Sequence, residues 1–434
     1  MRIRDAVSGD IYFNDLEEYC IRHPSFQRLH SIKQLGNAFQ VYPSAMHTRF
    51  EHSLGVSHQM KKLLQQPSFF PPEYSIDNHK KDLLGLAGLL HDIVHTPFKH
   101  TLDRDSGVLP EPELKAEYNY RFEQINLKNK IGETDINILL DILATKDPFD
   151  LDEPYLHQMI EDTISADLLD YSRRDGYYSA GWGKQWDERI YDHIAISYYN
   201  GKPHLVAKLT DIKGRVTPSA ITELVNLLQI RYTLNERVYL YPTKIAADSL
   251  LVKSIRSLIL NTGINPTKLV KDIREMSDEG IINYLATCDN DETKLYAEHL
   301  KKRILPGLAC AFKHNELTLH EQAGIASCCR GYENLEKWKM SEAQIEKEAK
   351  VEPGSIIIYC HDIEMQKKEP DFLVYYDISQ EPQPVENNQE MRDEIMAIGN
   401  KHKNLWRCYI FCYDRDPEAI KRIKNVSNRI LKNL

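Results

Sequence analysis

The chain lacks any long hydrophobic run, and no stretch approaches the roughly 18 consecutive apolar residues of a transmembrane helix. Its N-terminal segment is charged where a signal peptide has an apolar core, so we expect a cytoplasmic protein with no membrane partner. The eight cysteines are scattered, with no CxxC pair and no histidine at zinc-finger spacing beside them. Positively charged residues are also fewer than negatively charged ones, with 55 Lys and Arg residues against 64 Asp and Glu residues. The net charge of −9 gives no overall field that favours nucleic acid, which is possible as a partner but not indicated, and an anionic ligand needs a local pocket.

What is present is the composition of a globular protein with more than one packing unit. The 434 residues exceed the roughly 100–200 of one domain, and 42% of them are hydrophobic against 27% charged. Apolar spacing of three and four, as in FQRLHSIKQL and DLLGLAGLL, predicts a mainly α-helical fold. We expect a core over residues 1–250, a helical extension over 251–350 and an α+β subdomain over 351–434.

Strands are predicted in a few short segments. Met1–Phe13 and Ile194–Ala207 are typical of β-hairpins, the second turning at Asn200-Gly201. Residues 215 to about 345 are expected to continue as helices. Beyond Gly354 the runs SIIIYC, DFLVYY and RCYIFCY predict strands, and RDEIMAIGN and DPEAIKRIKNVSNRIL predict helices. The C-terminal part contains no recognisable chemistry, and we expect a structural or oligomerisation role for it.

Four residues indicate a metal site. Thr48 and Glu51 have capping-box spacing, which places His52 in the first turn of a helix. His91 and Asp92 end an apolar run, and Asp167 lies in the helical segment SADLLDYSRRD. Two imidazoles and two carboxylates suit Mn, Fe, Ni, Zn or, less well, Mg. The alternative is a capping histidine, a buried hydrogen-bonded pair and a salt-bridge acid with no metal.

The stretch FQRLHSIKQLGNAFQVYPSAMHTRFEHSLGV, followed by AGLLHDIVHTPFKHTLD and ADLLDYSRRDGYYSAG, resembles the HD-domain phosphohydrolases. The similarity is to the deoxynucleoside triphosphate triphosphohydrolase branch and runs from about Met1 to Lys244. It implies a helical HD-domain fold with a short N-terminal hairpin over the predicted core. It also implies that His52, His91, Asp92 and Asp167 are the ligands of a divalent metal.

The resemblance assigns further roles to individual residues. His95 would handle a proton of the attacking or leaving oxygen, His100 matches a pocket histidine, and Asp103 matches an acid that orients a catalytic histidine. The expected nucleotide-binding residues are Gln34 and Leu35 near the sugar, Arg49 and Arg231 at the phosphates, Tyr171 and Asp175 at the phosphate and 3′-hydroxyl, and Tyr239 under the sugar. For His100 and Tyr239 the alternative is an ordinary core side chain.

Two positions depart from the family pattern. Where relatives have a catalytic histidine before Glu-Gln this chain has Phe122, and a phosphate-binding lysine of some relatives is replaced by Leu168. The resemblance therefore implies hydrolysis of deoxynucleoside triphosphates to deoxynucleoside and triphosphate, with His95 taking over proton transfer. Phe122 and Leu168 favour an alternative, another metal-dependent phosphohydrolase or phosphodiesterase acting on a nucleotide or nucleic acid. A third interpretation is a nucleotide-binding sensor with little turnover.

Regulation and assembly are the last expectations from the family. Members work as oligomers with nucleotide at their interfaces, so a homo-oligomer between dimer and hexamer is implied. The animal member of the family binds guanine through an acid and an arginine at two positions that are Arg22 and His30 in this chain. Activation by a guanine nucleotide is therefore not expected. Arg22, Arg28 and Lys33 could serve a different anionic effector or form a solvated basic face.

Overall fold

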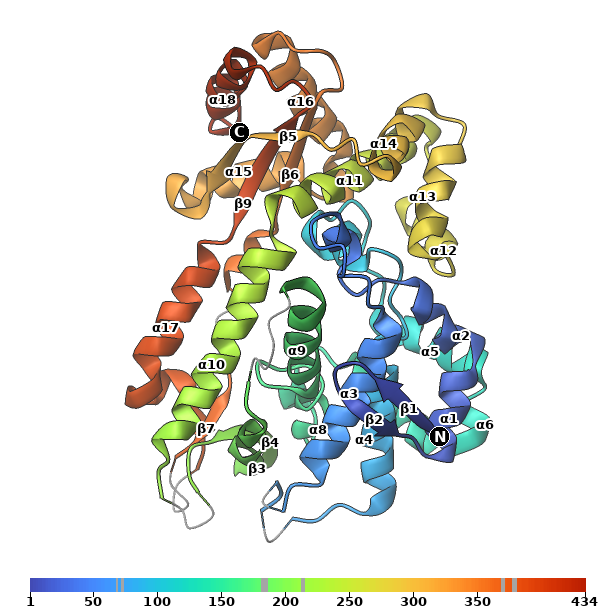
Figure 1. Ribbon diagram of the computed structural model, residues 1–434, viewed down its shortest axis with the longest axis vertical. Coiled ribbons are helices and arrows are strands. Elements are labelled where there is room, and N and C mark those ends of the chain that lie inside the picture. The colour runs from blue at the N-terminus through green and yellow to red at the C-terminus, as the bar shows by residue number, and fades with distance from the viewer. Residues whose placement is uncertain (68, 72–73, 181–185, 212–214, 368–370, 377–380) are drawn as a thin grey trace.

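The computed structural model describes the chain except for residues 68, 72–73, 181–185, 212–214, 368–370 and 377–380. It is mainly α-helical, with small sheets at the N-terminus, beside the core and in the C-terminal part (Figure 1), which confirms the predicted fold class. Its strands and helices are β1 (Arg2–Asp5), β2 (Gly9–Tyr12), α1 (Asp15–Arg22), α2 (Pro24–Gln27), α3 (Arg49–Leu64), α4 (Asn78–Leu90), α5 (Leu114–Ile125), α6 (Lys128–Ile131), α7 (Glu133–Ala144), α8 (Tyr155–Gln158), α9 (Ala166–Ala180), β3 (Ile194–Tyr199), β4 (Lys202–Lys208), α10 (Pro218–Leu234), α11 (Pro242–Thr262), α12 (Pro266–Ile273), α13 (Asp278–Thr287), α14 (Asp291–Lys301), β5 (Gly307–Lys313), α15 (Leu319–Cys329), α16 (Leu335–Ala349), β6 (Ile356–Cys360), β7 (Leu373–Tyr375), β8 (Gln383–Pro384), α17 (Gln389–Lys403), β9 (Arg407–Cys412) and α18 (Pro417–Leu431).

Both predicted hairpins are confirmed. Strands β1 and β2 pair antiparallel with Arg2 opposite Tyr12, and β3 pairs with β4 with Ile194 opposite Ala207. The second hairpin turns at Asn200 and Gly201, whose φ angles of 50° and 75° lie in the left-handed region. Asparagine and glycine tolerate that region better than other residues, which is why this dipeptide marks tight hairpins.

The C-terminal strands form where they were predicted, but they divide between two sheets. Strand β9 lies between β5 and β6 in one antiparallel sheet, whereas β7 pairs in parallel with β4 of the second hairpin. Strand β5 was not predicted, because its segment GLACAFK falls within the region expected to be helical throughout. Pairing with β9 across the subdomain overrides local sequence pattern there.

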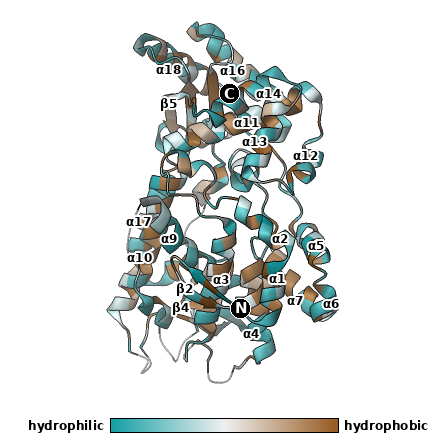
Figure 2. Ribbon diagram, turned by 45° about the vertical axis from the view of Figure 1, so that its right-hand side comes forward, coloured by the Kyte–Doolittle hydropathy of each residue, from teal (hydrophilic) through white to brown (hydrophobic). Residues whose placement is uncertain are grey.

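Hydrophobic side chains gather in two main clusters. One packs residues of α1, α3, α4, α7 and α9 together, and the other is built around α11, α16 and the sheet of β5, β6 and β9. Phe372, Val374, Met391 and Ile395 return to the first cluster from far along the chain. In Figure 2 hydrophobic and hydrophilic residues alternate along the helices, as amphipathic packing requires. The boundaries at 250 and 350 remain a prediction.

Among the described residues, no helix combines the length and the hydrophobicity that crossing a bilayer would require.

One buried histidine of the C-terminal part makes stability depend on pH. The His361 ring is 1% exposed and lies between the rings of Tyr359 and Tyr409. Burial, with a smaller contribution from the Lys244 cation, lowers the pKa of His361 to about 3. At pH values between about 3 and the ordinary histidine pKa, His361 is protonated in the unfolded chain and neutral in the folded chain. The free energy of unfolding therefore decreases as the pH falls through this range.

We expect His361→Gln to lose less stability on acidification than the wild type does. Between pH 7 and pH 5 the difference in the free energy of unfolding should be about 2 kcal/mol. Urea denaturation at the two pH values measures it. An equal loss in both proteins would show that His361 is not held neutral.

Candidate metal centre

Helix α3 positions His52 through its cap. Thr48 is the N-cap, and its backbone N–H donates to Glu51 Oε2 at 2.7 Å, which confirms the predicted capping box and the place of His52 in the first turn. The His52 ring is 1% exposed. Its Nδ1 donates to Asp170 Oδ2 at 2.9 Å, and its Nε2 lies 2.9 Å from Asp167 Oδ1. With Nδ1 occupied, Nε2 is the nitrogen that faces the centre.

His91 comes from the end of α4, which packs closely against α3. A β-carbon at Gly88 would lie 2.7 Å from the Met60 side chain and 3.3 Å from the Ser57 backbone, so glycine allows the two helices to approach. His91 Nδ1 donates to the Gly88 carbonyl at 2.8 Å. This bond leaves Nε2 as the unprotonated nitrogen, 3.3 Å from His52 Nε2.

His52, His91 and Asp167 form one group that can hold a metal ion. Their ligand atoms all lie within 4.8 Å of one another. Burial lowers the pKa of His52, but hydrogen bonds to Asp167 and Asp170 outweigh it and raise the pKa to about 10. The surroundings therefore favour a positive charge at this point, which is what a divalent cation supplies. Two oriented imidazoles and a carboxylate suit a divalent metal such as Mn, Fe, Ni, Zn or Mg, and this ion is the cofactor that the group fits.

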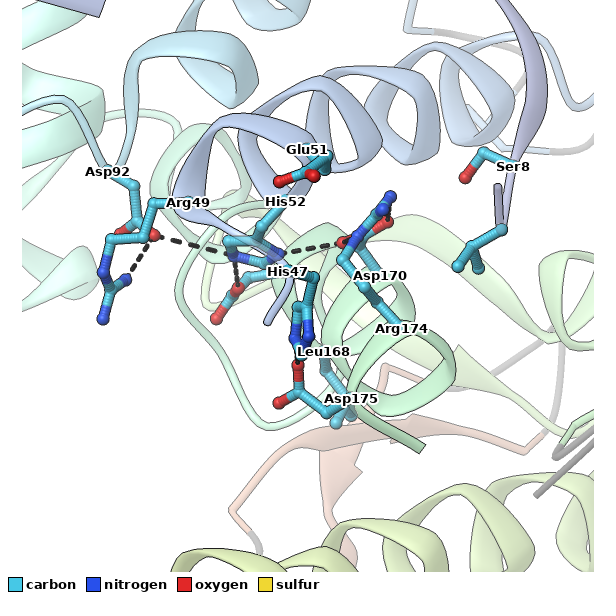
Figure 3. Close-up of polar contacts among 12 residues, drawn as sticks. Ser8, His47, Arg49, Glu51, His52, Asp92, Leu168, Asp170, Arg174 and Asp175 are labelled. Carbon is cyan, nitrogen blue, oxygen red and sulfur yellow. Dashed lines mark hydrogen bonds and ion pairs between the residues drawn. The ribbon is translucent and has the colours of Figure 1, made fainter. Parts of the chain in front are cut away.

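Asp92 lies beside this group and joins it to other predicted residues. Its Oδ1 is 3.5 Å from His91 Nε2, and its Oδ2 is 3.7 Å from His52 Nε2. Arg49 reaches Asp92 Oδ2 at 2.5 Å (Figure 3). His95 Nε2 lies 3.1 Å from Asp92 Oδ1. Asp92, a predicted ligand, is thus not one of the three residues grouped above; its carboxylate lies near His52 and His91 and also pairs with Arg49 and His95.

The two pocket histidines differ in environment. His95 is 8% exposed, and burial together with the Arg49 cation lowers its pKa well below the usual histidine value. It is therefore a neutral imidazole, and its Nδ1 has no hydrogen-bond partner among the described residues. His100 is exposed, so it is not a satisfied core histidine, and its ring centroid lies 5.1 Å from that of His95.

A second cluster lies farther along α9. Tyr239 Oη donates to Asp175 Oδ2 at 2.6 Å, and His47 Nε2 lies 2.8 Å from Asp175 Oδ1. The ring of Tyr178 stacks on His47 with centroids 4.7 Å apart. Gln34 is linked to the same cluster, because its backbone N–H donates to the His47 carbonyl at 3.0 Å. The structure thus brings Asp175 and Tyr239 into direct contact, and Gln34 is joined to them only through the backbone of His47.

The remaining predicted residues are less closely tied to either cluster. Tyr171 lies in α9, and burial raises its pKa to about 12 against the opposing effect of Arg231. Arg231 forms no ion pair with any residue that the structure describes. Leu35 belongs to the hydrophobic core at 9% exposure. Asp103 accepts the Arg104 backbone N–H at 2.5 Å and contacts no histidine among the described hydrogen bonds, while burial raises its pKa to about 6.

The ion network that holds His52 was not predicted from the sequence. Behind the ring, Asp170 pairs with Arg174 Nε at 2.8 Å (Figure 3). Arg174 NH1 reaches Asp5 of β1 at 2.8 Å. All three side chains are at most 3% exposed. A β-carbon at Gly55 would lie 1.9 Å from Asp170 Oδ1, so only glycine on α3 leaves room for this network. The spacing of four between Asp170 and Arg174 was the available signal.

The predicted basic face is wrong for two of its three residues. Arg22 is exposed, but the side chain of Arg28 is 7% exposed and that of Lys33 is 9% exposed. Lys33 pairs with Asp278 and Glu279, and Arg28 donates to backbone carbonyls. Carboxylates and carbonyls from distant parts of the chain cover both cations.

Comparisons with known proteins agree with this geometry. A family model described as HD domain matches residues 49–142. An uncharacterized protein of Methanocaldococcus jannaschii is 29% identical over 292 residues, which are 66% of this chain and 55% of that protein. The deoxynucleoside triphosphate triphosphohydrolase SAMHD1 of Bos taurus is 42% identical over 113 residues, which are 26% of this chain and 19% of that protein. The chain thus spans about half, or less, of the length of these curated relatives.

A solved structure resembles almost the whole fold. The crystal structure of a phosphohydrolase from Bacteroides thetaiotaomicron superposes with a TM-score of 0.67 at 19% identity, and the match covers 95% of this chain and all of that one. It shows the fold alone. Taken with the matched domain and its histidine and aspartate group, the chain contains an HD domain and resembles the HD-domain phosphohydrolases of the deoxynucleoside triphosphate triphosphohydrolase branch.

Proposed function

We propose that this protein hydrolyses deoxynucleoside triphosphates to deoxynucleoside and inorganic triphosphate. The observation that carries the proposal is that the metal group and the Tyr239–Asp175 contact each include an aspartate of α9, Asp167 and Asp175. Such an arrangement can hold a sugar at one end of the helix and its phosphates at the other. The similarity to the deoxynucleoside triphosphate triphosphohydrolase of Bos taurus supports the same substrate class.

The two arginines are suited to the triphosphate. Arg49 is fixed by Asp92 beside the metal group, and Arg231 has no ion-pair partner among the described residues. A guanidinium pairs with phosphate oxygens through two parallel hydrogen bonds, so each arginine can orient one phosphate. In this proposal Tyr171 contributes its hydroxyl between them.

The sugar would lie against Tyr239 and Asp175. The Tyr239 hydroxyl and the Asp175 carboxylate are hydrogen-bonded at 2.6 Å, which fixes the ring. Asp175 can accept a hydrogen bond from the 3′-hydroxyl, and the fixed ring would exclude a 2′-hydroxyl. Gln34 and Leu35 complete this side of the pocket in the proposal.

His95 is the group placed to transfer a proton. As a neutral imidazole beside Asp92 it can accept a proton at Nδ1 and pass it to the leaving oxygen. His100, exposed next to it, can donate a further hydrogen bond to phosphate. When bound at His52, His91, Asp92 and Asp167, a divalent metal would supply charge neutralisation on the phosphate and a more acidic water.

Phe122 and Leu168 favour a second candidate function, hydrolysis of a nucleotide or nucleic acid with release of monophosphate. Phe122 is 2% exposed and packs on Tyr118, and Leu168 is 1% exposed, so neither position offers a polar group to a triphosphate. A metal-dependent phosphohydrolase or phosphodiesterase that releases monophosphate needs fewer cationic contacts. A homo-oligomer with nucleotide at its interfaces, which the resemblance to the family implies, stays part of the first proposal.

Product analysis tests the proposal. The purified protein is incubated with each deoxynucleoside triphosphate, singly and mixed, in Mg or Mn, with the ribonucleotides as matched controls, and the products are separated by anion exchange. We expect deoxynucleoside plus inorganic triphosphate, with little turnover of the ribonucleotides. Release of monophosphate or pyrophosphate would favour the second candidate, and nucleotide binding without any product would indicate a sensor.

A further inference from the structure

A surface pocket of about 510 Å³ opens on the side of the molecule where α2 and α5 meet the end of α12. Figures 1 and 2 both show α12 next to these two helices. We name it the arginine pocket, and it is lined by His23, Pro24, Ser25, Arg28, Gln124 and Glu275. It shares none of these residues with the metal centre.

Arg28 is the buried cation of the arginine pocket. Its two terminal nitrogens donate to the carbonyls of His95 and Ile93, each at 2.9 Å. Its Nε makes no hydrogen bond with any described residue and lies 4.0 Å from Glu275 Oε2. Burial, and then the charge of Arg121, lowers the pKa of Arg28 to about 9. A buried guanidinium whose Nε–H lacks a hydrogen-bond partner among the described residues is suited to an anion.

Arg121 lies directly behind the pocket and is fully buried. Its NH1 donates to both oxygens of Glu275, at 2.7 and 3.0 Å, and to Gln124 Oε1 at 3.0 Å. A third cation, Arg274, pairs with Glu117 at 2.6 Å. Arg28 and Arg121 therefore share the single carboxylate of Glu275, and this part of the protein carries an excess of positive charge.

Glu275 differs from its partners because it is half exposed. Its side chain is 49% exposed, whereas that of Arg28 is 7% exposed and that of Arg121 is 0% exposed. A carboxylate at the mouth of a pocket can turn into solvent at little cost, but the two guanidinium groups behind it cannot. Ser25 and Gln124 add polar atoms, joined by a hydrogen bond of 2.9 Å.

We propose that the arginine pocket binds the phosphate group of a small molecule, which takes the place of the Glu275 carboxylate against Arg28 and Arg121. A phosphate offers more acceptor oxygens and more charge than a carboxylate, so it can satisfy the free Nε of Arg28 as well as Arg121. Arg28, which would hold the phosphate, also donates to the Ile93 and His95 carbonyls and so contacts the segment that carries His91, Asp92 and His95.

The test measures binding of inorganic phosphate by calorimetry in the presence of EDTA, so that neither catalysis nor a metal is involved. Three proteins are compared: the wild type, Glu275→Gln, and Glu279→Gln as the control. Glu279 also pairs with a buried cation, Lys33 at 2.7 Å, but it does not line the pocket. The side chains of Glu275 and Glu279 are 49% and 67% exposed, so neither variant should prevent folding.

We expect Glu275→Gln to bind phosphate at least about tenfold more tightly than the wild type, because the competing carboxylate is gone. Glu279→Gln should bind as the wild type does. Phosphate held elsewhere, including at the metal centre, contributes equally to all three proteins and cancels. Unchanged or weaker binding by Glu275→Gln, or equal tightening in both variants, would overturn the proposal. Either result leaves the proposed hydrolysis untouched.

Discussion

Replacement of His52 by alanine is expected to lower kcat/KM for triphosphate release from deoxynucleoside triphosphates by at least about a thousandfold. The ring links Asp167 and Asp92 on one side to Asp170 on the other, and its Nε2 is 3.3 Å from His91 Nε2. Without it the metal group loses one of its two oriented nitrogens. Steady-state kinetics at saturating Mn measure the effect.

A second histidine–aspartate pair provides the control for this prediction. His79, at the start of α4, lies 3.0 Å from Asp135 on α7 and is 64% exposed. His79→Ala removes an imidazole of the same kind outside the metal centre, so its kcat/KM should match that of the wild type. If a folded His52→Ala protein also hydrolyses nucleotide at the wild-type rate, the metal assignment is wrong.

Replacement of Asp170 by alanine is expected to reduce both stability and metal affinity. Asp170 is fully buried between His52 and Arg174, and the Arg174 cation holds the pKa of this carboxyl well below its usual range. Its loss leaves Arg174 with only Asp5, which should cost about 3 to 5 kcal/mol in the free energy of unfolding. His52 also loses the partner that orients its ring, so metal affinity should fall about 10- to 100-fold.

Asp248→Ala separates the two effects. Asp248 is buried and pairs with Lys244 four residues earlier at 2.6 Å, as Asp170 pairs with Arg174 four residues later. Both variants should lose stability in urea denaturation, but only Asp170→Ala should bind Mn more weakly in a calorimetric titration of folded protein. Equal metal affinity in the two variants would show that Asp170 supports the fold and not the centre.

The positions of His52 and His91 could be predicted because they depend on residues close to them in the sequence. The capping box of Thr48 and Glu51 fixes His52, and the end of an apolar helix places His91, so both positions depend on residues within one helical turn. The strands after Gly354 were predictable for the same reason, since their β-branched composition is local.

Contacts between segments far apart in the chain could not be predicted from the sequence patterns. Asp5 meets Arg174 across 169 residues, and the burial of Lys33 depends on Asp278, some 245 residues away. Strand β5 forms only because β9 pairs with it. The carboxylates that cover Arg28 and Lys33 come from α13 and the segment after α12. These two residues, predicted from the sequence to lie on a basic surface, are therefore buried in ion pairs.

The measurement that bears most directly on the central claim is the metal content of the protein. Purified wild type, stripped with EDTA and re-equilibrated with Mn, is compared with His91→Ala and with the His79→Ala control by plasma mass spectrometry. We predict about one tightly held ion per chain in the wild type and the control, and almost none in His91→Ala. Equal metal in all three proteins, or none in the wild type, would contradict a metal centre at His52, His91 and Asp167.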